Sequence, residues 1–296
     1  MSAAPPLISV VVPTVGRVRS LGRCLTALEH ADYEPGRFEV VVANDRGLEE
    51  VESMVASFAD RLRASTARPA RSGPSAARNA GAAAALGEYV AFTDDDCEPE
   101  PRWLAELERS LVANSGAASG GAVRNGATEN LGAVATQAVV DALHSGFNRD
   151  LDAPRFFASS NVAFPSRAFR SLGGFDEDER YAEDRDLCER WIAAGNRFVS
   201  APEAVVVHMR TLDLREFMGQ HYGYGRGAFA FNGVQSSERR GGDRIAVLGG
   251  LAHESLNHHE GHSRPALAAY LLLSQLATGA GFVREAVARS IARARS

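Results

Sequence analysis

ISVVVP, residues 8–13, is a short, mostly apolar run rich in β-branched residues and ended by a proline. Such a run is typical of a strand buried on both faces of a parallel sheet. Similar runs follow at 38–45 (FEVVVAND) and 88–93 (EYVAFT). Helical patterns of apolar residues separate and follow them, at residues 17–31, 49–62, 75–86 and 101–114. This alternation predicts an α/β fold with a mostly parallel, doubly wound sheet.

Each of the three predicted strands ends at a polar residue. Thr14 follows the first strand, Asp45 ends the second and Asp94 follows the third. In doubly wound sheets, ligands bind just outside the carboxyl ends of the strands. The sequence therefore predicts a binding site at this edge of the sheet.

The second half of the chain is less regular. We expect strands at 156–164 and at 204–207, the latter ending at His208, and a helix at 183–194. A further helix is expected at 213–231, interrupted by glycines, and a helical tail follows a polar linker. The fold class is therefore α/β with a C-terminal helical extension.

Composition excludes several classes of function. The net charge is −5 over 296 residues, so we expect no nucleic-acid partner. The chain contains no lysine, which excludes Schiff-base chemistry and a P-loop. Its cysteines, Cys24, Cys97 and Cys188, form no CxxC pair, so neither a disulfide framework nor a zinc knuckle is expected. The first seven residues lack the features of a signal peptide, and we expect a cytoplasmic protein.

Asp94-Asp95-Asp96 is the strongest chemical signal in the sequence. Three adjacent carboxylates repel one another, and a bound cation would offset that repulsion. Hard oxygen ligands suit Mg²⁺ or Mn²⁺, which keep coordination positions open for substrate phosphates. An acidic turn before the next helix would explain the same residues without any metal, and the motif alone does not decide between the two.

Six segments in a fixed order extend this signal. They are VVPTVGR (11–17), VVANDRG (41–47), GPSAARNAG (73–81), FTDDDCEPEPRWL (92–104), SSNVAFPSRAFRSLGGFDE (159–177) and EDRDLCERW (183–191). With them, residues 8 to about 232 resemble family-2 glycosyltransferases of the GT-A fold, which is Rossmann-like. The resemblance implies a catalytic domain over 1–232, with a nucleotide-binding half at 1–115 and an acceptor-binding half at 116–232. Residues 233–296 then form the linker and the helical tail.

The resemblance also implies the donor and metal sites. The residues that it assigns to the nucleotide-sugar are Pro13, Thr14, Arg17, Asp45, Arg78, Asp94 and Asp95. Asp45 would accept a hydrogen bond from the N3–H of uracil, which suits a carboxylate and favours a UDP-sugar. Asp94, Asp96 and His208 match positions that hold the metal, Mn²⁺ or Mg²⁺. Taken alone, Asp45 also fits a simple turn after a strand, and His208 a hydrogen-bonded structural histidine.

For the reaction, the resemblance implies a single general base. Asp184 matches that base, with Glu183 beside it, and direct displacement would then invert the anomeric centre. Asn161, Gly174 and Phe175 would line the acceptor pocket. Glu183 and Asp184 also fit the first turn of a helix, where the dipole favours acidic residues.

The sequence departs from the family pattern at two places. Val15-Gly16 stands where Tyr-Asn is usual, and Asn44 stands where an aspartate is usual, so UDP, GDP and dTDP all stay open. Two other classes also stay open: a nucleotide-sugar-binding module without turnover, and a nucleotidyltransferase. The histidines at 253, 258, 259 and 262 predict a solvated loop.

The acceptor and the role of the tail are not defined by the sequence. A lipid-linked glycan and a small molecule are both compatible with an acceptor hydroxyl. Residues 266–283 are apolar, and arginines with few acids follow them. This pattern fits a helix on an anionic membrane surface, and it equally fits a tail that packs on the fold or joins two subunits in a homodimer.

Overall fold

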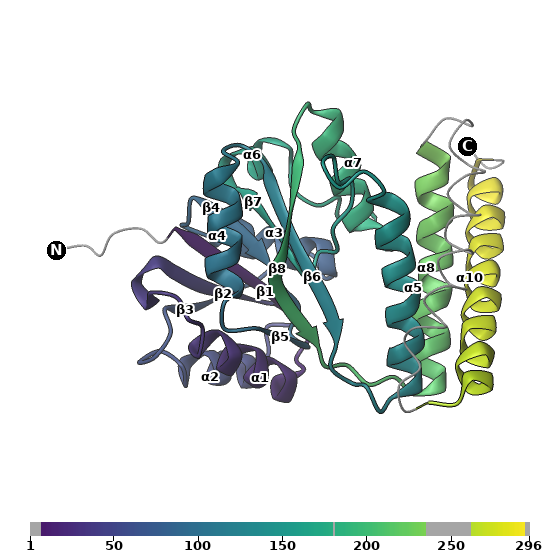
Figure 1. Ribbon diagram of the computed structural model, residues 1–296, viewed down its shortest axis with the longest axis horizontal. Coiled ribbons are helices and arrows are strands. Elements are labelled where there is room, and N and C mark those ends of the chain that lie inside the picture. The colour runs from purple at the N-terminus through teal and green to yellow at the C-terminus, as the bar shows by residue number, and fades with distance from the viewer. Residues whose placement is uncertain (1–6, 180, 235–261, 294–296) are drawn as a thin grey trace. The chain divides into compact units, whose positions relative to one another are not determined.

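The computed structural model describes residues 7–179, 181–234 and 262–293 (Figure 1). The chain forms two compact units. Unit 1 consists of Met1–Arg124, Asp150–Asp178 and Glu183–Met209. Unit 2 consists of Asn125–Arg149, Glu179–Ala182 and Arg210–Ser296. The domain boundaries expected at residues 115 and 232 stay predictions.

Unit 1 is built on a sheet with the strand order β3-β2-β1-β4-β7-β6-β8-β5. The strands are β1 (Ile8–Thr14), β2 (Phe38–Asn44), β3 (Ala64–Ala67), β4 (Tyr89–Phe92), β5 (Cys97–Pro99), β6 (Ala118–Asn125), β7 (Val162–Pro165) and β8 (Phe198–His208). From β3 to β4 the neighbours are parallel, with Ile8 opposite both Phe38 and Tyr89. Antiparallel pairs β4–β7, β6–β7 and β5–β8 extend the sheet. The predicted α/β class is confirmed.

Helices cover both faces of this sheet. They are α1 (Val18–Glu29), the short 3₁₀ turn η1 (Pro35–Arg37), α2 (Glu49–Ala56), α3 (Pro74–Ala84), α4 (Trp103–Ala113), α6 (Ser166–Ser171) and α7 (Glu183–Ala193). Successive side chains of a strand point to opposite faces, so Val10 and Val12 join one apolar cluster and Val11 the other. This two-sided burial explains why the first strands are continuous apolar runs.

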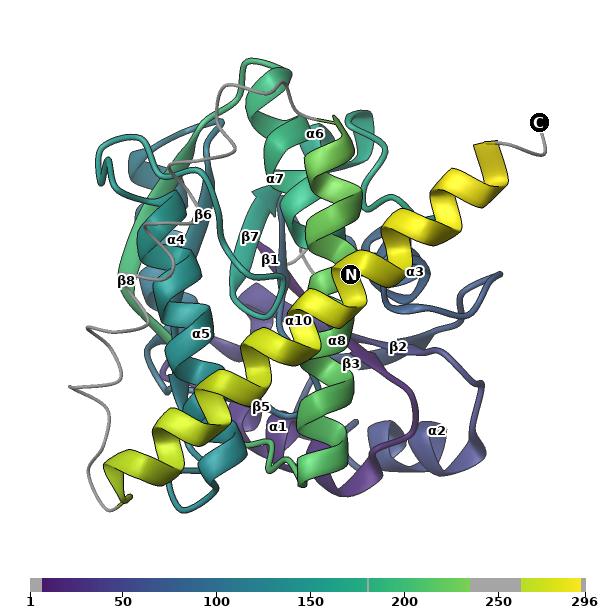
Figure 2. The ribbon, with the colours of Figure 1, turned by 90° about the vertical axis from the view of Figure 1, so that its right-hand side faces the viewer.

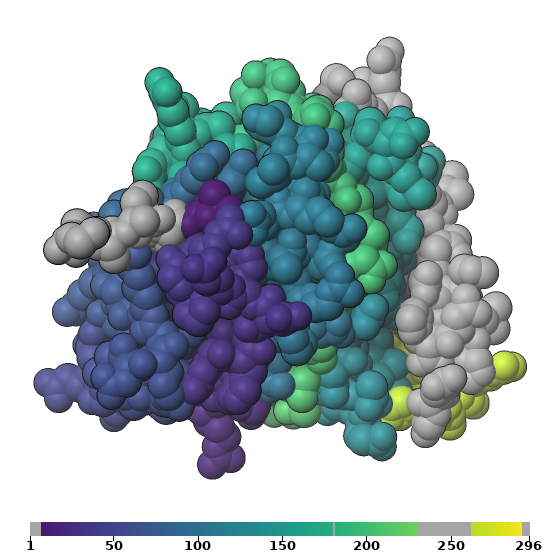
Figure 3. All heavy atoms as spheres, turned by 60° about the vertical axis from the view of Figure 1, so that its left-hand side comes forward, coloured from purple at the N-terminus to yellow at the C-terminus, as the bar shows by residue number. Residues whose placement is uncertain are grey.

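Segments far apart in the sequence meet on the outer surface of unit 1. Arg37 Nη2 donates to Glu108 Oε1 at 2.7 Å, and the Asp32 N–H donates to the Pro101 carbonyl at 2.7 Å. Figure 3 shows the purple segment around α1 and the blue-teal segment around α4 as one continuous surface. The helices on this face therefore act as one layer over the strands.

The structure differs from the sequence-based expectation in detail. β5 follows the three aspartates at a place where no strand was expected, and β3 was not expected either. The strand expected at 156–164 is shorter, at β7, and the one expected at 204–207 is longer, at β8. Short strands such as β3 and β5 depend on pairing with a neighbour, which a local pattern does not reveal.

Unit 2 contains three long helices, α5 (Leu131–Phe147), α8 (Leu214–Val234) and α10 (Arg264–Arg293). Figure 2 shows α10 crossing α8 and α5, both of which it contacts. The Asn130 side chain caps α5 by accepting from the Ala133 N–H at 2.8 Å. Val134, Phe217 and Leu267, one from each helix, form the apolar contact between them.

The glycines of α8 do not interrupt the helix, contrary to expectation. A Cβ at Gly225 would lie 1.9 Å from the Thr278 carbonyl oxygen, and one at Gly281 would lie 2.0 Å from that of Tyr222. The backbones of α8 and α10 therefore approach each other as closely as only glycine permits. A helix tolerates this residue where packing requires it, although glycine lowers its intrinsic stability.

Two predicted features of the tail, the linker and the group of histidines, are only partly described by the structure. Residues 235–261, with most of the linker and the histidines at 253, 258 and 259, lie outside the described residues. His262 is described, and its Nε2 lies 2.7 Å from the Thr128 carbonyl oxygen, within unit 2. Among the described residues, α10 is the one helix long and apolar enough to cross a membrane by length and composition.

The close approach of α8 and α10 can be tested with two glycines of one helix. Gly281→Ala should lower the unfolding free energy by about 1–3 kcal/mol, because its methyl group overlaps the backbone of α8. Gly279→Ala is the matched control, since nothing lies within 4 Å of its Cβ position. Alanine there should raise stability by up to about 1 kcal/mol. Chemical denaturation measures both, and equal effects would contradict the packing.

Candidate active site

The candidate active site lies at the carboxyl ends of β1, β2 and β4, the edge that the sequence predicted. Thr14 pairs with Asn44, so Asp45 follows β2 directly beside the end of β1. The Asp45 N–H donates to the Thr14 carbonyl at 3.0 Å. The Thr93 N–H donates to the Val11 carbonyl at 3.2 Å, which brings the acidic run after β4 to the same edge.

Asp95 is completely buried and has two partners, one at the end of β1 and one in the turn that follows it. The Thr14 hydroxyl donates to its Oδ2 at 2.6 Å, and the Arg17 guanidinium forms an ion pair with its Oδ1. Burial raises the pKa of Asp95 above its ordinary value, although Arg17 and Thr14 oppose that shift. This carboxylate therefore ties the acidic motif to the first turn of the fold.

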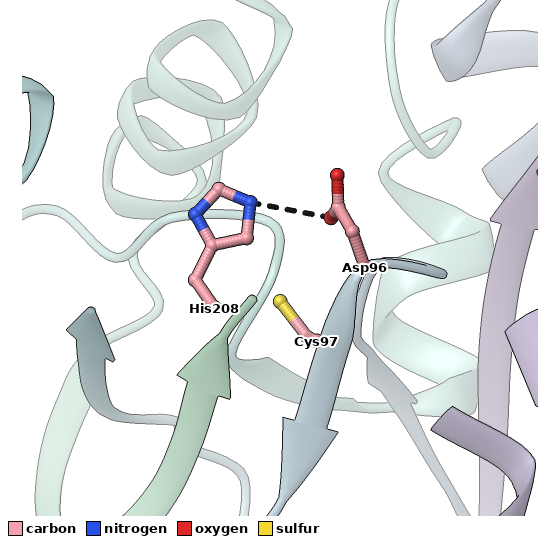
Figure 4. A group of neighbouring side chains, drawn as sticks. All are labelled: Asp96, Cys97 and His208. Carbon is pink, nitrogen blue, oxygen red and sulfur yellow. Dashed lines mark ion pairs between the residues drawn. The ribbon is translucent and has the colours of Figure 1, made fainter. Parts of the chain in front are cut away.

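Asp96 meets both Arg17 and His208. Arg17 Nη1 donates to Asp96 Oδ2 at 2.7 Å, and His208 Nε2 lies 3.2 Å from Asp96 Oδ1 (Figure 4). The histidine arrives here because β8 pairs antiparallel with β5, with His208 opposite Cys97. The Met209 N–H also donates to the Asp96 carbonyl at 2.8 Å. Strand pairing, rather than the helix that follows, fixes this contact.

The donor atoms around Asp96 fit a divalent cation. Ligand atoms of Asp96, Cys97 and His208 all lie within 4.8 Å of one another. Burial raises the pKa of the Cys97 thiol well above its ordinary value, and a soft sulfur ligand does not suit Mn²⁺ or Mg²⁺. A carboxylate oxygen and an imidazole nitrogen, which suit Mn²⁺, are left. Asp94, the other predicted metal ligand, does not belong to this group.

Arg78 joins the acidic motif to the start of α7. Its Nη2 donates to Asp94 Oδ1 at 2.8 Å, and its Nη1 donates to Glu183 Oε1 at 3.2 Å. The side chain is buried, and its guanidinium lies 5.5 Å from the centre of the Phe175 ring. A planar guanidinium with five donors in a rigid fork can hold two carboxylates in a fixed geometry in this way.

The predicted catalytic pair, Glu183 and Asp184, lies in the first turn of α7. Burial, followed by the charge of Asp184, raises the pKa of Glu183 to about 7, while Arg78 opposes the rise. Burial likewise raises the pKa of Asp184, although the Arg185 N–H donates to its Oδ1 at 2.8 Å. Carboxylates with raised pKa values at such an edge suit proton transfer near neutral pH.

Asp45 lies at the same edge of the sheet, but its side chain bonds to the segment before α3 and not to the acidic motif. The Ser72 hydroxyl donates to Asp45 Oδ2 at 2.7 Å, and the Gly73 N–H donates to Oδ1 at 2.9 Å. These partners are 27 and 28 residues away, so Asp45 does not form the local turn that was the simpler interpretation. Pro13, half-buried in β1 opposite Ala43, completes the predicted base-contacting residues.

The predicted acceptor residues occupy two different environments. Asn161 is buried: its Oδ1 accepts from Trp103 Nε1 at 2.8 Å, and its Nδ2 donates to the carbonyls of Ala122 and Ala204. The Asn161 side chain therefore links segments in the interior of unit 1. Gly174, with a φ of 68°, precedes Phe175, whose ring packs 5.2 Å from that of Phe92, centre to centre.

Sequence reasoning missed how two residues contribute. Arg17 was assigned to the nucleotide-sugar, but it also neutralises Asp95 and Asp96 directly. Asn79 was overlooked, although its Oδ1 accepts from the Phe175 N–H and its Nδ2 donates to the Phe175 carbonyl, both at 2.9 Å. Its place beside Arg78 in the ARN segment was the available signal.

Comparison with known proteins identifies the family of this chain. The family model described as glycosyl transferase family 2 matches residues 9–172, and that of glycosyl transferase family group 2 matches residues 116–283. The chain belongs to glycosyl transferase family 2.

Its relatives among characterised proteins carry glycosyltransferase names. It is 31% identical over 231 residues to a pre-mycofactocin glycosyltransferase of Mycobacterium tuberculosis, covering 75% of this chain and 46% of the relative. It is 30% identical over 204 residues to a validoxylamine A glucosyltransferase of Streptomyces hygroscopicus subsp. limoneus, covering 58% and 44%. The chain thus spans about half the length of these relatives.

Solved structures share the fold. A mannosyltransferase from Pyrobaculum calidifontis, in complex with GDP-Man and Mn²⁺, aligns with a TM-score of 0.66 at 18% identity, covering 95% of this chain and 87% of that one. Residues 1–349 of S. aureus TarS, in complex with UDP-GlcNAc, align with a TM-score of 0.55 at 14% identity, covering 96% and 92%. The GT-A fold predicted from the sequence is confirmed.

The raised pKa of Glu183 makes stability depend on pH. Between about pH 4.5 and pH 7 the native carboxyl binds more protons than the unfolded one, so the unfolding free energy should fall as pH rises. Glu183→Gln keeps an acceptor for Arg78 but cannot ionise, and should therefore flatten this fall. Urea denaturation at pH 5 and pH 8 measures it, with Glu189→Gln on α7 as the control. Identical pH dependence in Glu183→Gln and the unaltered protein would contradict the assignment.

Proposed function

We propose that this chain is a glycosyltransferase that moves a sugar from a nucleotide diphosphate-sugar onto an acceptor hydroxyl. The observation that carries the proposal is Arg78, which links Asp94 of the acidic motif to Glu183 of the acidic pair. Sugar transfer needs both parts, one to bind the donor diphosphate and one to take the acceptor proton. Family membership supports the reaction type, and the complexes of structural neighbours with GDP-Man and UDP-GlcNAc support a nucleotide-sugar donor.

The proposed donor is a UDP-sugar. Each carboxylate oxygen can accept more than one hydrogen bond, so Asp45 can receive the N3–H of uracil while it keeps Ser72 and Gly73. The residues assigned to the donor in this proposal are Pro13, Thr14, Arg17, Asp45, Arg78, Asp94 and Asp95. Arginines take the place that lysine fills in many phosphate sites, because the chain has no lysine.

The proposed cofactor is Mn²⁺ or Mg²⁺, with Asp96 and His208 as its ligands and Asp94 as a third candidate. Imidazole favours Mn²⁺ over Mg²⁺. When bound, the cation would neutralise charge on the leaving diphosphate. Arg17 already brings one positive charge to Asp96, which partly offsets the repulsion among the three carboxylates.

In the proposed reaction, Asp184 takes the proton of the acceptor hydroxyl as its oxygen attacks the anomeric carbon. The bond from that carbon to the diphosphate oxygen breaks, and its electron pair leaves with the diphosphate. Burial raises the pKa of Asp184 and so strengthens it as a base. With a single base opposite the leaving group, the product has inverted configuration. Gly174 and Phe175 would shape the acceptor side, with Asn161 behind them.

The metal assignment predicts a loss of cation binding on substitution of either ligand. Asp96→Asn should abolish turnover and remove the stabilisation that Mn²⁺ gives to thermal unfolding. His208→Gln should weaken Mn²⁺ binding at least about tenfold. Electron paramagnetic resonance of free Mn²⁺, titrated without donor, measures the affinity. Glu98→Gln, which removes a carboxylate that pairs with Arg23, is the control. Full activity in EDTA would overturn the metal role.

The base assignment predicts a separation of binding from catalysis. Asp184→Asn keeps size and removes basicity, so transfer should fall by a factor on the order of 10² to 10⁴. UDP binding in the presence of Mn²⁺, measured by calorimetry, should stay within about twofold. Asp186→Asn is the matched control, because Asp186 lies in the same helical turn and pairs with Arg190. If both variants lose the same stability and Asp184→Asn shows no specific loss of sugar transfer, then Asp184 serves only to stabilise the first turn of α7.

A further inference from the structure

The outer side of α10 carries a continuous apolar stripe. Its members are all about half exposed or more: Leu272 (62%), Leu276 (59%), Val283 (61%), Val287 (50%) and Ile291 (48%). They follow one another at spacings of four or seven residues, which keeps them on one side of a helix. The opposite side packs within unit 2, where Leu267, Ser274 and Ala277 are buried.

This stripe is not the surface of an ordinary core helix. In the most apolar 18-residue window of α10 only 28% is buried, whereas a helix in the core of a soluble protein is mostly buried. Residues 265–283 include no charged side chain. At about 1.5 Å per residue, the 28-residue segment extends for roughly 40 Å. Scattered apolar residues on a surface are common, but a continuous stripe of this length marks an interaction surface.

The charges beside the stripe have one sign. The exposed charged residues that the structure describes on α10 are Arg264, Arg284 and Arg289. Its one described acidic residue, Glu285, is largely covered and accepts from Arg226 Nε at 2.8 Å and from Arg289 Nε at 3.1 Å. Arg289 is thus paired with an acid of its own helix, whereas Arg284 follows Val283 of the stripe and adds positive charge beside it, the combination that binds anionic lipid surfaces.

We propose that α10 lies along the surface of an anionic membrane, with the stripe among the acyl chains and the arginines near the headgroups. The inference is independent of the proposed sugar transfer, and it would bring the chain to acceptors carried on lipid. A second copy of this chain is a poorer occupant, because the described part of its α10 would set arginines against arginines, its one acid, Glu285, being already paired. The lipid headgroups supply the missing negative charge.

The contacts of α10 favour a position on the membrane rather than across it. Thr278 Oγ1 donates to the His221 carbonyl at 3.2 Å, and the backbone at Gly281 touches that at Tyr222. α10 is thereby held to α8, which carries Arg215 and Arg226. Moving both helices into hydrocarbon would require the burial of these charges, which costs several kcal/mol each.

The experiment is flotation of the full chain with vesicles. Vesicles of phosphatidylcholine alone are compared with vesicles that contain phosphatidylglycerol, at low and high salt and without donor. Binding should require phosphatidylglycerol and weaken as salt rises. The double variant Leu276→Asp/Val283→Asp should reduce partitioning at least about tenfold. Its matched control is Leu86→Asp/Val112→Asp, which changes one leucine and one valine of unit 1 that are 61% and 59% exposed.

A second pair of variants isolates the electrostatic part. Arg284→Gln should reduce partitioning onto phosphatidylglycerol about fivefold, and Arg167→Gln, an exposed arginine of α6, should not. Melting temperatures show that each variant is folded. Three outcomes would overturn the proposal. The first is no flotation at low salt, and the second is flotation that depends neither on phosphatidylglycerol nor on the two aspartate substitutions. The third is a dimer in light scattering that Leu276→Asp/Val283→Asp dissociates, with no vesicle binding.

Discussion

Mutual repulsion among Asp94, Asp95 and Asp96 is the constraint on which the described site depends. Asp95 and Asp96 are almost completely buried, where an uncompensated carboxylate costs several kcal/mol. Arg17, from the turn after β1, and Arg78, from α3, both form ion pairs with this motif and offset its charge. Because each arginine holds more than one carboxylate, the turn after β1, the end of β4 and the start of α7 have to assemble together.

The antiparallel strands of the sheet supply the histidine that the parallel strands lack. The first four strands, β3 to β4, bring the acidic run and Asp45 to one edge, but they contain no histidine. β5 continues the chain directly from Asp96 and pairs with β8, so His208 arrives at the carboxylate through backbone hydrogen bonds. A side chain held by strand pairing has little freedom to move, and such rigidity is what a binding or catalytic site requires.

The helices of unit 2 pack against one another differently from the elements of unit 1. Its helices meet through glycine and hydroxyl residues as well as apolar ones, since Gly225 and Gly281 admit the neighbouring backbone and Thr278 bonds a carbonyl across the contact. Close packing of this kind leaves the large apolar residues of α10 pointing outward. The apolar character of α10 therefore does not mean that the helix belongs to a core.

The sequence by itself determined the α/β class, the parallel strands β1, β2 and β4, and the acidic residues at their ends. Buried parallel strands are continuous apolar runs, and polar residues at their carboxyl ends stand out locally. Tertiary structure alone decided that Arg17 pairs with Asp95 and Asp96, that Arg78 joins Asp94 to Glu183, and that Asn161 serves the interior. It also decided that the glycines of α8 belong to a continuous helix. These outcomes depend on contacts between residues tens of positions apart, and local patterns of hydrophobicity and charge carry no information about such pairs.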